Sequence, residues 1–398
     1  MAQAHAFDIA SLFLPGLTIW LATLVVTWRA TSNPGLAASL ATIKAGIFTI
    51  YFAILFDGTY TFVDDWWYLE GGAELRAEGV GLLNMFDNVP VLMAVGQGEH
   101  FLYYLYNAIA FDLFGEGYYA PVALNSALTA VIAGLGTTLA VRERLVPQRQ
   151  RAIFFAFMLL HPDILAWSTV LNGKDTLVLL LHVLLLYAVS LYLNQQRRTA
   201  VLLAAPTVLA ALFLRYYVPI LFAAAWVVST AAQLRRGARW RTLFVGLIVF
   251  GGLFAQLGTE GLNFALDRLR EDMVNPLVGV VRFALTPVPF NTEAAYGFLD
   301  IPALFHWLML PAVALGIYRV SKSGRRFSRF LLAYTVVFVS LYAIYGELQG
   351  PRHRVQLDFA LAVYQFIGIG VLGNLLVAWR AYRRPAPPEP MQGALTDA

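Results

Sequence analysis

Residues 175–193 read DTLVLLLHVLLLYAVSLYL, a run in which the only charge is the Asp at its start. A helix needs about 20 consecutive apolar residues to cross a bilayer, so this run has the length and composition of a membrane span. Similar runs recur along the 398-residue chain. We predict an all-α polytopic membrane protein of about eleven spans, at 7–28, 36–56, 118–141, 152–171, 175–193, 199–214, 217–233, 242–258, 303–320, 330–346 and 357–379.

The composition agrees with this class. Hydrophobic residues make up 59% of the chain and charged residues only 13%, with a mean hydropathy of +0.65. A soluble domain carries roughly 25% charge, so an ordinary soluble enzyme and a disordered chain are both excluded. The chain has no cysteine, which excludes disulfides, thiolate metal sites and cysteine nucleophiles. We expect one transmembrane domain over 1–384 and a disordered Pro-rich tail over 385–398.

The distribution of charge predicts an orientation. With the N-terminus outside, most of the 28 Lys and Arg residues fall on the inner side, and most of the 24 acidic residues fall outside. Because cytoplasmic loops are enriched in Lys and Arg, we expect a cytoplasmic C-terminus, and we read the basic excess as an orientation signal rather than a nucleic-acid footprint. Two long outer loops follow, 57–117 and 259–302, the first with an interfacial helix at 100–115. A strong preference for Arg over Lys is typical of a GC-rich bacterial genome, so we expect this membrane to be a bacterial inner membrane.

An acidic pair stands just beyond the second predicted span, in the segment Asp64-Asp65-Trp66-Trp67-Tyr68. Aromatic side chains anchor at headgroup level, so the two carboxylates would lie at the height of a lipid phosphate. A carboxylate placed there can accept a proton from an acceptor hydroxyl. Two other interpretations stay open: the pair could bind a divalent cation, or it could simply cap a helix and offset its dipole.

This arrangement resembles the C-type superfamily of integral-membrane glycosyltransferases (GT-C), in which an early span leads to an outer loop with an acidic pair, an aromatic residue and a helix. The stretch Gly98-Glu99-His100-Phe101-Leu102-Tyr103-Tyr104 takes the place of the family's Pro-Pro-Leu-Tyr-Tyr segment, without its prolines. The resemblance implies a polyprenyl-phosphate sugar donor, a glycan or lipid-linked acceptor, and no required cofactor. It assigns the catalytic role to Asp64 and Asp65, and it adds Tyr68, Glu99 and His100 as substrate-binding candidates.

A second motif, Asn172-Gly173-Lys174-Asp175, opens the fifth predicted span. Many polysaccharide-assembly members of the superfamily show a similar Lys-Asp at the start of a Leu-rich helix. A lysine at a helix N-terminus opposes the helix dipole, and a bound phosphate would compensate for this. We therefore interpret Lys174 and Asp175 as substrate-binding residues. The alternative is a surface ion pair without a further role.

Three further basic positions are predicted on the outer side. Arg215-Tyr216 separates two short apolar helices, and Arg352-His353-Arg354 opens the last span. An arginine at a membrane boundary must snorkel, pair with a carboxylate or bind an anion, and its planar guanidinium fits phosphate oxygens. The second group resembles the Arg-x-Arg opening of the last span in bacterial exopolysaccharide members. We interpret Arg215, Tyr216, Arg352, His353 and Arg354 as a phosphate-binding group, with interface anchoring as the alternative.

These observations favour a membrane glycosyltransferase acting on the outer, periplasmic face, with no protein-bound metal site. Two alternatives remain. An O-antigen-type polysaccharide polymerase or ligase relies on basic residues of a late outer loop, for which Arg268, Arg270 and Arg282 are available. A lipid or polysaccharide transporter would need charges near the midplane and an inverted repeat. No repeat is evident, and Lys44 is the only notable charge predicted inside a span.

Overall fold

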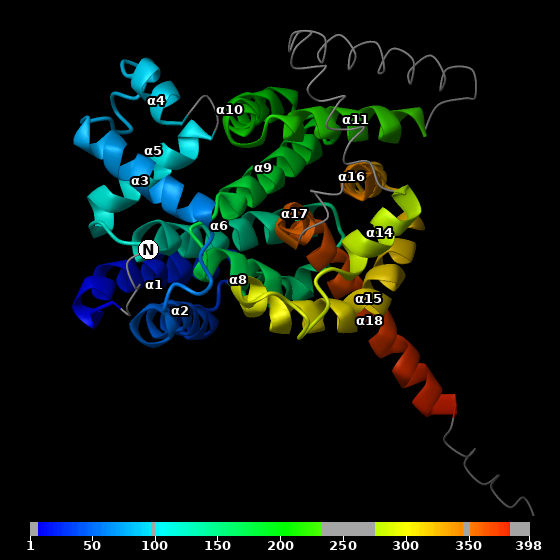
Figure 1. Cartoon of the computed structure of the whole chain (residues 1–398). Helices are drawn as coiled ribbons and strands as arrows, with labels where there is room; N and C mark the ends of the chain where they lie inside the picture. The colour runs from blue at the N-terminus through cyan, green and yellow to red at the C-terminus, as the bar shows by residue number, and fades with distance from the viewer. Residues whose placement is uncertain (1–6, 97–99, 233–274, 345–350, 383–398) are drawn as a thin grey trace, which may run out of the picture.

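The computed structural model describes residues 7–96, 100–232, 275–344 and 351–382 (Figure 1). Within these ranges the regular secondary structure is helical, with no strand. In this described part of the chain, eight helices are long and apolar enough to cross a membrane, and a bent pair of shorter helices is a ninth candidate. Helices satisfy all their backbone hydrogen bonds internally, as the bilayer interior requires. The chain is therefore a multi-pass membrane protein.

The long apolar helices are α1 (Ile9–Thr31), α2 (Pro34–Ile50) extended by a π-helical turn (Tyr51–Leu55), α6 (Tyr119–Arg142), α9 (Asp175–Leu193), α10 (Arg197–Arg215), α15 (Asp300–Ser321), α16 (Arg326–Ile344) and α18 (Asp358–Tyr382). The last of these is preceded by the short helix α17 (Pro351–Arg354). The shorter helices are α3 (Val63–Ala77), α4 (Val89–Val95), α5 (Phe101–Phe114), α7 (Arg151–Leu159), α8 (Pro162–Thr169), α11 (Tyr217–Ala231) and α14 (Pro276–Leu285).

Eight of the eleven predicted spans coincide with these long helices. The predicted span 152–171 is instead the pair α7 and α8, whose axes differ by 43°. Proline has no N–H and its ring clashes with the preceding turn, so Pro162 separates the two helices. The predicted span 217–233 is the 15-residue helix α11, shorter than a full crossing requires. The predicted span 242–258 and the predicted tail 385–398 lie outside the described residues.

The predicted outer loop 57–117 is largely helical. Helices α3, α4 and α5 gather at one end of the molecule in Figure 1. Helix α5 corresponds to the helix predicted at 100–115. Helices α3 and α5 approach closely at Gly72, which has no side chain. A Cβ at this position would lie only 2.6 Å from Asn107 Cβ, so a larger residue would push the two helices apart. Helix α3, whose first turn carries the acidic pair, is thus held closely against α5.

The last span is held by a similarly close contact. Helices α15 and α18 pack along each other, and a Cβ on Gly316 would lie 2.0 Å from the carbonyl oxygen of Tyr364. Small residues let membrane helices approach at backbone distance, which strengthens their van der Waals packing. Because a single 3-10 turn (Val355–Leu357) joins α17 to α18, this packing sets the position of the Arg-His-Arg segment.

Candidate functional site

Four charged side chains from four separate helices form one continuous chain of ion pairs. An Arg352 terminal nitrogen lies 3.0 Å from Asp64 Oδ2, and Arg352 Nε lies 2.7 Å from Asp175 Oδ2. The other oxygen of Asp175 lies 2.6 Å from a terminal nitrogen of Arg215. The order is therefore Asp64, Arg352, Asp175, Arg215. The structure brings together the acidic pair's first member, the Lys-Asp motif and two of the three predicted arginines.

Burial differs steeply along this chain of ion pairs. The side chain of Asp175 is 1% exposed, whereas that of Asp64 is 44% exposed. A buried charge is tolerated only when it is paired and hydrogen-bonded, and Asp175 meets this condition with one guanidinium on each oxygen. Arg215 donates a further hydrogen bond of 2.8 Å to the Tyr217 hydroxyl. Asp175 and Arg215 are thus fixed by their protein partners, whereas Asp64 is exposed enough to contact a ligand.

Lys174 lies beside this chain but is not part of it. Its amine donates a 2.8 Å hydrogen bond to the Tyr68 hydroxyl of α3. Burial lowers the pKa of Lys174 to about 6, and the positive charges of Arg215 and Arg352 add to the effect. Burial also raises the pKa of the Tyr68 hydroxyl, so this partner keeps its proton. The neutral amine of Lys174 is therefore favoured when no anion is bound beside it.

The two members of the acidic pair occupy different environments. Asp65 is buried, and its Oδ2 accepts hydrogen bonds from the Phe62 N–H at 3.0 Å and from the Tyr118 hydroxyl at 2.9 Å. Burial raises the pKa of Asp65 to about 7, although both hydrogen bonds oppose the shift. Asp65 thus closes the first turn of α3, so the capping contact is made by Asp65 and not by Asp64. Asp64 is the member that faces the exposed site.

A buried amide network connects the Lys174 loop to α3. The Asn172 side chain donates to the Asp65 carbonyl oxygen at 3.0 Å and to Asn107 Oδ1 at 2.9 Å, and it accepts from the Tyr103 hydroxyl at 2.9 Å. Its backbone N–H donates to Tyr118 at 3.1 Å. Every polar group of the Asn172 side chain is therefore engaged. This network fixes the distance between the acidic segment and Lys174.

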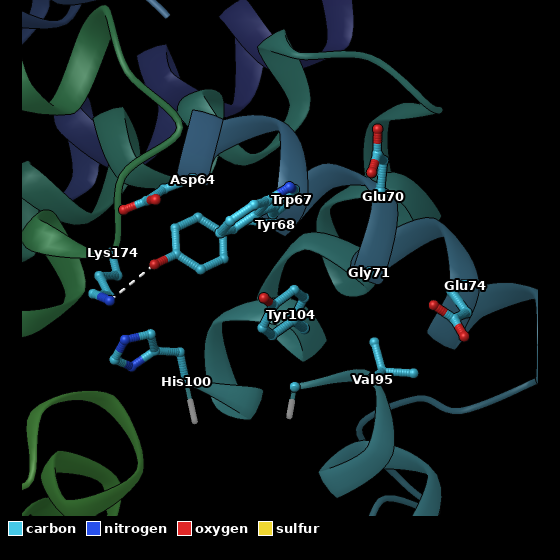
Figure 2. A pocket seen from close by; sticks show the side chains of 11 residues that line it. Asp64, Trp67, Tyr68, Glu70, Gly71, Glu74, Val95, His100, Tyr104 and Lys174 are labelled. Carbon is cyan, nitrogen blue, oxygen red and sulfur yellow. Dashed lines mark hydrogen bonds between the residues drawn. The ribbon is translucent and has the colours of Figure 1, made fainter. Parts of the chain in front are cut away.

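A cavity of about 620 Å³ opens on this arrangement (Figure 2). It is lined by Asp64, Trp67, Tyr68, Glu70, Gly71, Glu74, Val95, Gly96, His100, Tyr104 and Lys174. In Figure 2, Asp64 and Lys174 lie on one side of the Tyr68 ring, and Glu70 and Glu74 lie at the opposite end. Ligand pockets span roughly 300–1,000 Å³, so the cavity has the size of a binding site. One end of the cavity therefore has both a carboxylate and an amine, from Asp64 and Lys174, and the other end has two carboxylates, from Glu70 and Glu74.

The remaining predicted site residues have varied positions. His100 lines the cavity, and burial lowers the pKa of its imidazole to about 4, with the charge of Lys174 contributing. Tyr216 is exposed, and its ring packs edge-on against Tyr217. His353 lies against the ring of Tyr342, with centroids 5.7 Å apart. Glu99 lies outside the described residues. Of this predicted group, His100 therefore belongs to the cavity as described.

Arg354 belongs to a second cluster rather than to the cavity. It is buried, it lies 3.4 Å from Asp163 of α8, and it donates to the carbonyl oxygen of Thr286. Asp358 lies in the same region and is fully buried, and neither of its carboxylate oxygens has a hydrogen-bond partner in the described chain. His161 bonds to Gln365 at 2.8 Å nearby. The Arg-His-Arg segment thus divides its arginines between two sites.

The described residues offer few side chains that could bind a metal ion together. Within the described ranges, no group of three or more His, Cys, Asp or Glu side chains is arranged to bind a metal ion. Asp64 and Asp65 themselves diverge, since one faces the cavity and the other faces Tyr118. A divalent cation at the acidic pair stays a prediction that would rest on Asp64 and on groups from a substrate.

Sequence reasoning missed several residues that hold the site together. Tyr118 and Asn107 belong to no motif, and Asn172 lies in the Lys-Asp motif without a predicted role of its own. Their signal is weak because a buried amide or phenol looks like any other polar residue in a loop. Comparisons with protein-family models, curated proteins and solved structures give no match for this chain. The candidate site therefore rests on its own geometry.

Proposed function

We propose that the protein is a membrane glycosyltransferase that moves a sugar from a polyprenyl-phosphate donor to a glycan or lipid-linked acceptor. The observation that carries this proposal is the exposed Asp64 carboxylate, which lines the 620 Å³ cavity together with Lys174 and pairs with Arg352. Glycosyl transfer from a lipid phosphate needs a base at the acceptor and positive charge at the departing phosphate. The cavity wall offers the base in Asp64, and positive charge is available from Lys174 in the same wall and from Arg352, which contacts Asp64.

The roles follow from position. Asp64 accepts the proton of the acceptor hydroxyl as its oxygen attacks the anomeric carbon. The bond from that carbon to the phosphate oxygen breaks, and the phosphate leaves with the electron pair. A single displacement inverts the configuration at the sugar carbon. Arg352 and Lys174 stabilise the departing phosphate, and a phosphate beside Lys174 favours the protonated amine because it supplies the missing counter-charge.

Asp175 and Arg215 act through Arg352. Asp175 is buried between the two guanidinium groups, so it orients Arg352 without reaching the cavity surface. One terminal nitrogen of Arg352 is buried and has no hydrogen-bond partner in the described chain. A buried N–H without a partner is costly, and a phosphate oxygen would satisfy it. Asp175 and Arg215 are thus positioning residues in this proposal.

The acceptor would occupy the acidic end of the cavity. Glu70 and Glu74 line that end, away from the phosphate-binding side (Figure 2). Carboxylates accept hydrogen bonds from sugar hydroxyls and repel a second phosphate. The division of charge would therefore orient donor and acceptor in opposite directions. With the predicted orientation, this reaction takes place on the periplasmic face of a bacterial inner membrane.

The deciding experiment is a transfer assay with the Asp64→Asn variant. Wild-type and variant protein, purified in lipid nanodiscs, are incubated with polyprenyl-phosphate sugars and with membrane glycolipid acceptors. We expect Asp64→Asn to lower turnover by about 100-fold or more, the usual size of a general-base contribution. Asp112→Asn is the matched control, because Asp112 forms an exposed ion pair with Arg76 outside the cavity. Equal turnover in both variants would contradict the proposal.

One observation favours a transporter as the second candidate. Asp163, Arg354 and Asp358 are buried charged residues within helices, and such residues often mark ion or proton pathways. A flux assay in proteoliposomes discriminates between the two. Transport of a lipid-linked sugar that is abolished by Asp163→Asn, with no chemical transfer by the wild type, would favour the transporter. For the polymerase alternative, Arg268 and Arg270 lie outside the described residues, and Arg282 lies in α14.

A further inference from the structure

An apolar cavity of about 360 Å³ lies between helices α9, α10 and α11 (green in Figure 1). Apart from Tyr192 and Trp226, its described wall consists of Leu, Ala, Val, Pro and Phe side chains. Val201 of α10 lines the cavity and is 60% exposed, so the cavity opens at the surface of the molecule. Because α10 has the length and hydropathy of a membrane span, this opening would face the hydrocarbon of the bilayer.

A second cavity, of about 230 Å³, adjoins the first at Tyr192 and Trp226, which line both. The two rings pack edge-on, with centroids 5.3 Å apart. Tyrosine and tryptophan prefer the level of the lipid headgroups, because each has an apolar ring and a single polar group. This aromatic pair therefore lies where an apolar cavity meets a polar one.

The second cavity is basic. Arg197 and Arg326 both line it, and its described wall contains no Asp or Glu. Neither guanidinium forms an ion pair with a carboxylate of the described residues. The other polar side chains of the wall include Gln195, Ser229 and Thr230, which can all donate hydrogen bonds. Such a wall suits the oxygens of a phosphate group.

The positions of the two arginines also favour an anion. Arg197 is the first residue of α10, and Arg326 is the first residue of α16. A cation at a helix N-terminus opposes the helix dipole, and an anion bound beside it removes this conflict. Both arginines lie on the predicted cytoplasmic side, where anionic lipid headgroups bind basic pockets between membrane helices. The Arg197 guanidinium lies over the ring of Tyr192, 5.7 Å from its centroid, and therefore at the boundary between the two cavities.

We propose that the two cavities together bind one anionic phospholipid of the cytoplasmic leaflet. Its phosphate contacts Arg197 and Arg326, and one acyl chain lies in the apolar cavity between α9, α10 and α11. A soluble phosphate would leave the apolar cavity unfilled, and a zwitterionic lipid would bring a further cation beside the two arginines. Helix α9 begins at Asp175 and ends at Leu193, so this lipid site lies at the opposite end of the helix from the candidate catalytic site. The proposal is therefore independent of sugar transfer.

Photolabelling tests the location and the charge of the ligand. Full-length protein is placed in phosphatidylcholine nanodiscs that contain a small, varied fraction of phosphatidylglycerol with a diazirine in one acyl chain. After illumination, peptide mass spectrometry locates the label. We expect it on the segments of α9, α10 and α11 that line the apolar cavity, for example at Val201 and Phe222. A phosphatidylcholine probe with the same chain should label these segments at least about tenfold less, and equal labelling by the two probes would overturn the proposal.

Two double variants test the arginines. With Arg197→Gln and Arg326→Gln together, the probe fraction that gives half-maximal labelling should rise by about 30-fold, because each basic residue beside an anionic headgroup contributes about fivefold. The matched control combines Arg198→Gln with Arg319→Gln, which removes the same charge from exposed positions that line neither cavity. It should change the half-maximal fraction by less than about threefold. Equal shifts in the two double variants would overturn the proposal, because they would show attraction by overall charge alone.

A third variant tests the apolar cavity while both arginines stay in place. Ala204 of α10 lines this cavity, so Ala204→Phe should fill part of it and lower labelling at least about tenfold. Unchanged labelling in Ala204→Phe would overturn the proposal, as would competition by soluble glycerol phosphate that equals competition by unlabelled phosphatidylglycerol. Labelling by a polyprenyl-phosphate probe but by no phospholipid would assign the cavities to the sugar donor instead. None of these outcomes depends on the Asp64→Asn transfer assay.

Discussion

Arg352 and Arg354 lie two residues apart in one short helix, yet they belong to different parts of the molecule. Arg352 joins an ion-pair chain that reaches a cavity through Asp64, and every carboxylate of that chain has a guanidinium partner. Arg354 pairs with Asp163 in a sealed cluster, where Asp358 has no hydrogen-bond partner among the described residues. The first cluster reaches a cavity and has equal numbers of carboxylate and guanidinium groups. The second is buried among helices and has one more carboxylate than it has guanidinium groups.

This difference shows how similar residues are used for different purposes. A charge at a cavity surface can meet a ligand, so its removal affects binding and chemistry. A charge sealed among helices interacts only with its protein partners, so its removal affects stability. We therefore expect variants of the two arginines to separate activity from folding.

The largest effect is expected from replacing each arginine by glutamine. Arg352→Gln should lower transfer by about 100-fold or more, because it removes a cation that stabilises the leaving phosphate. Arg354→Gln should instead cost about 3–5 kcal/mol of stability, because it leaves Asp163 buried without its charged partner. Transfer rates and thermal unfolding in nanodiscs measure both. If Arg354→Gln lost activity at full stability, the two clusters would not be functionally distinct.

A smaller, pH-dependent effect is expected at Lys174. The pKa of its amine is about 6 in the folded protein and near 10.5 in an unfolded chain. Between these values the unfolded chain binds more protons, so the wild type gains stability as pH rises. Lys174→Met removes this titration. It should raise the unfolding temperature by several degrees at pH 6–7, with a gain that shrinks toward pH 10.

A constant difference between Lys174→Met and the wild type across this range would mean that Lys174 keeps its proton in the folded state. Lys322→Met is the matched control. Lys322 is exposed, so the same substitution there should change the unfolding temperature by less than about 1 °C at every pH.

The smallest effect is expected within the sealed cluster. Asp358→Asn removes a carboxylate that has no donor in the described chain, so it should change stability by less than about 1 kcal/mol or increase it. Asp163→Asn removes the partner of Arg354 and should cost more. The two unfolding curves, compared at pH 7, test this order. The reverse order would show that Asp358 is the residue that neutralises Arg354.

Much of the candidate site could be predicted from the sequence, but its internal order could not. The motifs that contain these charged residues all lie at the outer ends of predicted spans, so the sequence predicts that they come together. The residues are Asp64, Lys174, Asp175, Arg215 and Arg352. Asp64 faces the cavity and Asp65 is buried, and this difference depends on the direction in which each side chain leaves α3 and on the hydrogen bond from Tyr118, which belongs to no motif. The Asn172 network escaped prediction because its partners, Asn107, Tyr103 and Asp65, come from distant segments.

The sequence by itself determined that this is a multi-pass helical membrane protein, because hydropathy and helix length are local properties of about 20 residues. Only the tertiary structure decided which charged side chain faces the cavity and which is sealed. The contact between Asp64 and Arg352 joins residues 288 positions apart. Such a contact depends on how α3, α9 and α18 pack, and helix packing is set by the shapes of whole surfaces rather than by any short motif.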